Sequence, residues 1–142
     1  MSEENKTEKS VEQSAPVIPD MVQLLSTFEN SPSQTDIESW KQKFGEIFVS
    51  GFSETEMFVW RPLQRGEYVA LQKKLREPSK ETGEQPSELD FEEWVTQTCI
   101  LWSSNKKICL QKGGTVATLS EQIMQNSNFL NPQMAAMLVM KL

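Results

Sequence analysis

One stretch of the sequence, residues 91–102, constrains the fold more than any other. Its apolar side chains recur at intervals of three and four, the spacing that places them on one face of an α-helix. A helix of this length is marginal in water by itself, so its apolar face has to pack against other elements. We therefore expect a helix at the centre of the core, with a core side formed by Phe91, Trp94, Val95, Cys99 and Trp102.

Further segments show the same periodicity, and several carry recognisable helix start signals. Ser87 and Asp90 form a cap-like pair just before the central helix. We expect five more helices: residues 21–30 after Asp20, residues 33–44 with Ser33 and Asp36 at the start and Gly45 at the end, residues 64–76, residues 118–126 with a Thr118–Glu121 capping box, and residues 132–142 after Asn131.

Residues 47–63 follow a different pattern. This stretch is rich in β-branched and aromatic side chains around a turn at residues 51–55. Short apolar runs do not distinguish a hairpin from the end of a helix followed by one extended segment, so both alternatives stay open. The expected fold class is therefore mainly α: a small helical domain with a short β-hairpin as one option.

The first 19 residues differ from the rest in composition. They carry Glu, Lys, Ser and Gln without an apolar face, and Pro16 and Pro19 close the segment. Such a composition buries too little apolar surface to offset the entropy lost on ordering. We expect a flexible acidic tail over residues 1–19, followed by a single mainly helical domain over residues 20–142, since 142 residues suit one domain.

Composition excludes several functional classes. The net charge of -6 argues against nucleic acid as the main partner, and the lack of any histidine removes the commonest general base and every imidazole metal ligand. The sequence contains no apolar run long enough to span a bilayer, and its N-terminus lacks the pattern of a signal peptide. We expect a cytoplasmic, non-enzymatic protein without a metal or cofactor, and without membrane or nucleic-acid partners.

The two cysteines fit the same picture. Cys99 and Cys109 are too few for a four-cysteine metal site, and in the cytoplasm thiols stay reduced. Cys99 lies on the apolar stripe of the central helix, where a thiol is usually a small core residue rather than a nucleophile. We predict that both are reduced structural thiols.

The C-terminal run is the candidate binding surface. Residues 134–142 read MAAMLVMKL, so that even the back of the expected helix is apolar. One interpretation is a terminal helix docked on the core through Met134, Met137 and Leu138; the other leaves part of its surface to a partner, because flexible thioether side chains suit adaptable recognition. The two are compatible. The predicted partner-binding residues are Met134, Met137, Val139 and Met140.

Residues 57–128 also carry a family resemblance. An extended MFVWRPL (residues 57–63), the RGEY that follows at residues 65–68, an acidic-headed helix ending in CILW (residues 99–102), and a glycine-rich turn into LSEQIM (residues 119–124) resemble the tail assembly chaperones of tailed bacteriophages. The resemblance covers about half of the chain, and its motifs are distinctive in combination rather than singly.

The resemblance implies a function but brings no catalytic or ligand residues. It implies a helical protein of the host cytoplasm that binds tape-measure or tail-tube protein during tail assembly, with self-association as a further option. The alternative is a structural component of the virion, such as a neck, baseplate or capsid-associated subunit. Both alternatives predict a protein-binding module with phage tail or other virion proteins as partners.

Overall fold

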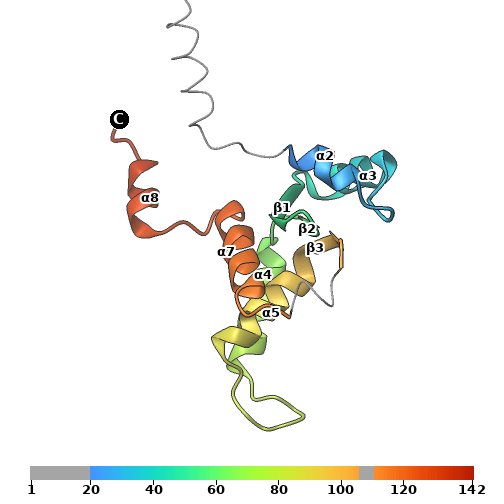
Figure 1. Ribbon diagram of the computed structural model, residues 1–142. Helices are drawn as coiled ribbons and strands as arrows, with labels where there is room; N and C mark the ends of the chain where they lie inside the picture. The colour runs from blue at the N-terminus through green and yellow to red at the C-terminus, as the bar shows by residue number, and fades with distance from the viewer. Residues whose placement is uncertain (1–19, 106–110) are drawn as a thin grey trace, which may run out of the picture.

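The computed structural model describes residues 20–105 and 111–142. The predicted flexible tail at residues 1–19 and the residues around Cys109 lie outside these ranges. Helices lie before, between and after the strands along the described chain (Figure 1). They are α2 (Met21–Ser26), α3 (Gln34–Phe44), β1 (Phe48–Ser53), β2 (Glu56–Trp60), α4 (Arg65–Arg76), α5 (Glu88–Cys99), β3 (Ile100–Ser103), α7 (Thr115–Asn126) and α8 (Pro132–Met137).

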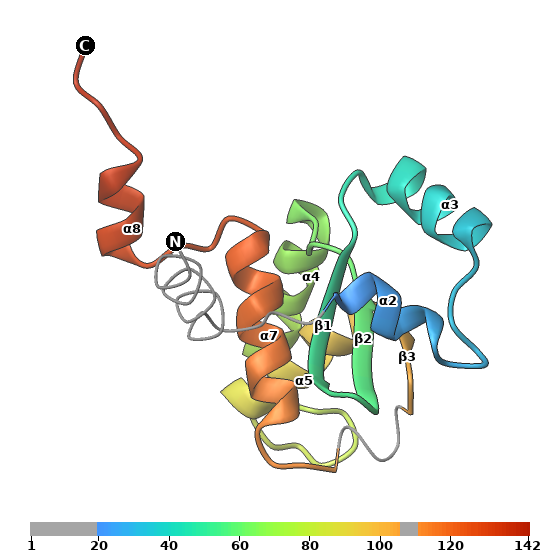
Figure 2. The ribbon, with the colours of Figure 1, turned by 45° about the horizontal axis from the view of Figure 1, so that its top comes forward.

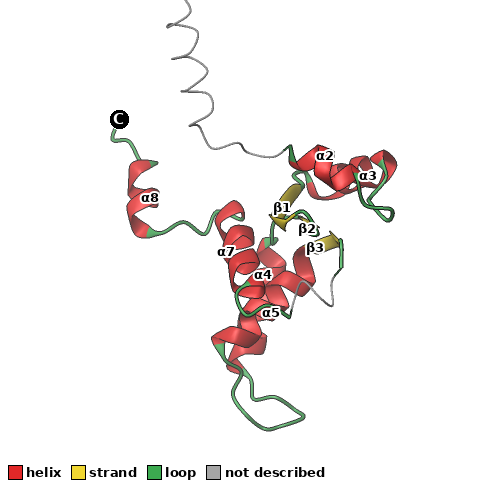
Figure 3. Cartoon of the chain, viewed as in Figure 1, coloured by secondary structure: helices red, strands yellow, loops and turns green. Residues whose placement is uncertain are grey.

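A three-stranded antiparallel sheet lies at the centre of the fold, in the order β1-β2-β3. Strands β1 and β2 form a hairpin, with Val49 opposite Val59 and Ser50 opposite Phe58. Of the two alternatives for residues 47–63, the hairpin is therefore confirmed, and a helix end followed by one extended segment is wrong. The sequence predicted no third strand. The expectation of a mainly α fold is therefore correct in part: helices predominate, but they are arranged around a sheet (Figure 3).

The central helix ends earlier than its apolar stripe predicts. Cys99 is the last residue of α5, and the chain becomes extended at Ile100. The backbone N–H of Arg61 donates to the Cys99 carbonyl oxygen at 3.1 Å, so pairing with β2 replaces the next helical turn. Trp102 consequently lies on β3 opposite Val59, and the prediction that it belongs to the helix is wrong.

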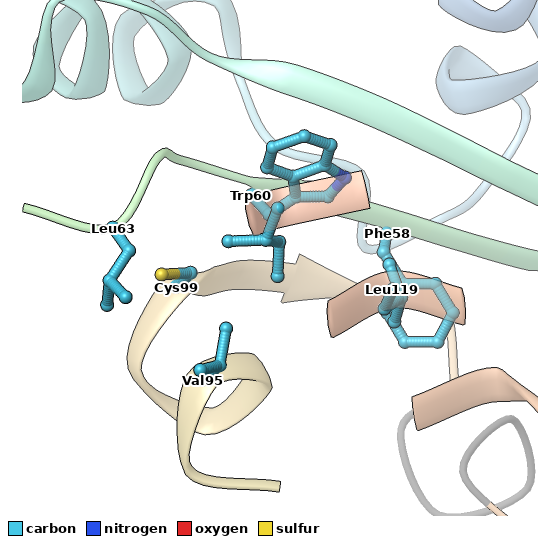
Figure 4. Close-up of a cluster of buried hydrophobic side chains, with 7 residues drawn as sticks. Phe58, Trp60, Leu63, Val95, Cys99 and Leu119 are labelled. Atoms are coloured by element: carbon cyan, nitrogen blue, oxygen red, sulfur yellow. The ribbon is translucent and has the colours of Figure 1, made fainter. Parts of the chain in front are cut away.

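Helices cover both faces of the sheet, so the fold has three layers. Figure 1 shows α2 and α3 on one side of the strands and α4, α5 and α7 on the other. Strand β2 is buried along its whole length, because its two faces contribute to two separate cores. The smaller core, toward α2 and α3, centres on Leu25, Met57 and Val59, and the larger one, in part shown in Figure 4, comprises Phe58, Trp60, Leu63, Val95, Cys99, Leu119 and Ile123.

A chain of two hydrogen bonds, the first of them buried, links the sheet to α7. The indole N–H of Trp60 donates to Ser50 Oγ at 2.8 Å, and this hydroxyl donates to Gln122 Oε1 at 2.6 Å. A buried indole N–H needs an acceptor, because leaving it unpaired costs free energy. The chain therefore fixes how β1, β2 and α7 lie against one another.

An ion pair joins the end of β2 to the start of α4. The guanidinium of Arg61 contacts both carboxylate oxygens of Glu67, with Nη2–Oε2 at 2.8 Å, and its Nη2 also donates to the Thr98 carbonyl oxygen at 3.1 Å. The guanidinium carbon lies 4.5 Å from the centre of the Phe44 ring. Arg61 is 8% exposed, so this charge depends on Glu67 for compensation.

Local cap signals locate most of the helix starts. The Ser33–Asp36 and Ser87–Asp90 pairs are confirmed as capping boxes, and Gly45 ends α3 with a φ of 85°, a conformation that suits glycine. The prediction of a capping box at Thr118–Glu121 is wrong, because α7 begins at Thr115.

The buried face of α7 explains its earlier start. Thr115, Leu119 and Ile123 follow one another at intervals of four and are all buried. The helix therefore has to begin at Thr115 to place the Thr115 side chain in the buried interface that Leu119 and Ile123 also form. The N–H of Thr118 then donates to the Gly114 carbonyl oxygen at 3.0 Å, as an ordinary helical hydrogen bond.

Candidate functional site

The core thiol has the environment of a structural residue. Cys99 is a fully buried free thiol between Val95 and Leu63 in the larger core (Figure 4). Burial raises the pKa of this thiol to about 12, although the nearby positive charge of Arg61 acts in the opposite direction. A thiol with such a pKa is almost entirely protonated at neutral pH, so it offers little nucleophile.

Surface chemistry of the described residues gives no cluster suited to a metal. Within residues 20–105 and 111–142, no three His, Cys, Asp or Glu side chains converge.

A hollow of about 450 Å³ lies where α4 and α5 meet the loop between them. The Lys74 ammonium lies 4.3 Å from the centre of the Trp94 ring at this hollow. Trp94 is therefore half-buried beneath a lysine and belongs to neither core, so the prediction that it lies on the core side of the central helix is wrong.

The predicted partner-binding residues lie on or just after α8. Asn131 caps this helix, accepting a hydrogen bond from the Met134 N–H at 2.8 Å, and Pro132 occupies the first turn, as expected. The helix ends at Met137 instead of continuing to Leu142. With six residues it is far below the ~12–15 at which an isolated helix becomes even marginally stable, so the cap is its main local support.

The C-terminal segment, residues 131–142, packs against no core. Every one of its residues is exposed, and in both views α8 stands away from the sheet and from α4, α5 and α7 (Figures 1 and 2). The interpretation that Met134, Met137 and Leu138 dock on the domain is therefore wrong: Met137 is 81% exposed and Leu138 74%. The larger core is already closed by Leu119 and Ile123 of α7.

The exposed side chains form an almost uncharged apolar surface. Met140 is 80% exposed, Val139 78% and Met134 46%, and Lys141 is the one charged side chain of the segment. Isolated apolar residues are common on protein surfaces, but a contiguous run marks an interaction site. The segment offers apolar contact and no group that could perform acid–base or nucleophilic chemistry beyond the Lys141 amine.

The sequence located this surface but not its full extent. Leu138 and Leu142 are as exposed as the predicted residues and belong to the same segment. The sequence feature that indicates the exposure of Leu138 and Leu142 is the lack of polar residues between Met134 and Met140, because a docked terminal helix would have one apolar and one polar face.

Within the described ranges, no helix combines the length and the apolar character needed to cross a bilayer. Compared with known proteins, the chain matches no family model, no curated sequence and no solved structure.

Proposed function

We propose that this protein is a non-enzymatic protein-binding module that acts in bacteriophage tail assembly and binds its partner through the C-terminal segment. The observation that carries the binding role is the exposure of Met134, Met137, Val139 and Met140 on a folded domain whose cores are complete without them. The tail-assembly setting rests on the resemblance of residues 57–128 to tail assembly chaperones. Tape-measure and tail-tube proteins are the partners that this resemblance implies.

The energetics suit a reversible contact. Burying one Val, Leu or Met side chain contributes ~1.5–3 kcal/mol, so the four residues together contribute roughly 6–12 kcal/mol before any cost. The entropy lost on association and on ordering a short helix offsets a large part of this gain. The cost of association alone is ~4–15 kcal/mol. A chaperone has to release its client, and binding through these four side chains would allow release.

The test compares wild type with three variants, each co-expressed with tape-measure or tail-tube protein. In the first variant, Val139→Asp is combined with Met140→Lys, which leaves the net charge unchanged. In the second, residues 132–142 are deleted. Val22→Asp is the matched control, because Val22 is 71% exposed on α2 and the change also places a charge on an exposed apolar residue.

We expect both C-terminal variants to fold as the wild type does and to lose co-purification with the partner, while Val22→Asp keeps it. Folding is checked by circular dichroism and thermal melting. If the deletion variant retains the partner, the binding role of the segment is refuted. Mass spectrometry of purified particles separates the two settings: a chaperone leaves the finished particle, whereas a structural subunit of the virion remains in it.

A further inference from the structure

Helix α4 presents a basic face in an acidic protein. The helix contains four basic residues and one acidic residue, Glu67, whose carboxylate is already paired with Arg61. Arg65, Lys73 and Arg76 lie at i, i+8 and i+11, which places them on one side of the helix, and all three are exposed. Within the part of the chain that the structure describes, none of these three has an ion-pair partner.

Apolar surface lies between these cations. A hollow of about 240 Å³ follows this side of α4, and Val69, 39% exposed, contributes to it together with the half-buried ring of Tyr68. The Arg65 guanidinium carbon lies 5.7 Å from the centre of this ring. We call this surface the basic α4 face; it is lined by Arg65, Tyr68, Val69, Gln72, Lys73 and Arg76.

The first turns of α5 carry the complementary arrangement. Leu89 is 71% exposed. Glu93, four residues later, lies on the same side of the helix, and Glu88, the preceding residue, lies roughly 100° around the helix axis from Leu89 on its other flank. Among the described residues these two carboxylates form no ion pair. We call Glu88, Leu89 and Glu93 the acidic α5 face.

We propose that these two faces bind one another between two copies of this chain. Leu89 of one copy would lie on Val69 in the α4 hollow of the other, with Glu88 and Glu93 facing Lys73 and its neighbouring arginines. Opposite charges around a small apolar contact guide association and fix its orientation. Because each copy carries both faces, the contact either closes a pair or repeats from copy to copy.

A second copy fits the basic α4 face better than nucleic acid does. The cations span one helix, while the whole protein carries a net charge of -6. A long polyanion would extend past α4 and meet repulsion, whereas the acidic α5 face is short. This contact uses neither α8 nor residues 138–142, so it is independent of the proposed function.

The test removes one face at a time without reversing its charge. One variant carries Lys73→Gln with Arg76→Gln, and the other carries Glu88→Gln with Glu93→Gln. Sedimentation velocity of the full-length proteins from about 10 µM to about 1 mM covers the affinity range of weak self-association. We expect wild type to self-associate, and to do so less as salt is raised from about 0.05 M to about 0.5 M, because screening weakens the ion pairs.

Each variant alone should associate at least ~10-fold more weakly than wild type, and an equimolar mixture should recover association, because each variant supplies the face that the other lacks. The matched controls are Lys41→Gln with Lys43→Gln and Glu29→Gln with Glu46→Gln, which make the same changes in net charge at exposed positions elsewhere. These controls should behave as wild type. A monomeric wild type overturns the proposal, as do face variants that associate normally or a mixture that recovers nothing.

Discussion

Replacing Glu67 by glutamine should destabilise the domain strongly, because the change removes the countercharge of a buried arginine. Glutamine has nearly the same shape, and its side-chain oxygen can still accept the hydrogen bond that Glu67 Oε1 receives from the Gln64 N–H at 3.0 Å. The helix cap is thereby kept, and the charge is what changes. The Arg61 side chain is 9% exposed, so water cannot replace the lost carboxylate.

The expected cost is about 2–3 kcal/mol. Removing one partner of a fully buried ion pair costs ~3–5 kcal/mol, and the Glu67 side chain is 28% exposed, which places this pair below that range. With a urea m-value of ~1–3 kcal/mol/M, the midpoint should fall by roughly 0.7–3 M. Adding Arg61→Met to Glu67→Gln should recover part of the loss, because the buried charge is then gone as well.

The ion pair between Arg61 and Glu67 should also affect how stability depends on pH in the acid range. The hydrogen bond from Arg61 is the main cause that lowers the pKa of Glu67 below its ordinary value of 4.5. The Glu67 carboxylate therefore binds a proton less readily in the folded state than in the unfolded state. The resulting stability is fully present above pH 4.5 and is lost as the pH falls through the lower folded pKa. Stability of Glu67→Gln should fall less steeply over this acid range than that of wild type.

Urea unfolding followed by tryptophan fluorescence measures these quantities. Glu29→Gln serves as a comparison, because it makes the same change at an exposed residue that forms no ion pair among the described residues; it should stay within about 0.5 kcal/mol. A cost of Glu67→Gln no larger than that of Glu29→Gln would refute the argument that burial makes the Arg61 charge dependent on its partner.

Two further predictions concern the core and its thiol. Leu119→Ala should cost ~2–5 kcal/mol in a urea melt, because Leu119 is fully buried, whereas Met137→Ala should stay within about 0.5 kcal/mol because Met137 is 81% exposed; equal costs would contradict the assignment of the core. In a Cys109→Ser background, Cys99 should resist thiol reagents at pH 8 in the native protein and react at once in urea, as expected for a buried thiol with a pKa of about 12; rapid labelling of the native protein would contradict this.

Local chemistry explains why several elements could be predicted from the sequence. The Ser33–Asp36 and Ser87–Asp90 boxes act within one helical turn, so neighbouring residues are sufficient to identify them. The hairpin was visible as one of two alternatives because its strands adjoin in sequence. These features need no information about distant parts of the chain.

Long-range packing explains what the sequence did not show. Trp102 fits the helical stripe of α5, and only pairing with β2, far away in sequence, places it on a strand. Likewise, Met137 has the spacing of a docked residue, but α7 already closes the core that it would cover. At the candidate site, composition identified the apolar segment, whereas its detachment from the domain depends on the other helices.

The doubly covered strand β2 has a consequence during synthesis. Residues 20–60 include the hairpin and the helices that cover one of its faces, and they leave the ribosome first. The partners of Phe58 and Trp60 on the other face, among them Val95 and Ile123, are translated much later. Until α7 is made, the nascent chain presents an aromatic strand face that invites premature association. Chains truncated before α7 should therefore depend on cellular chaperones far more than the finished protein does.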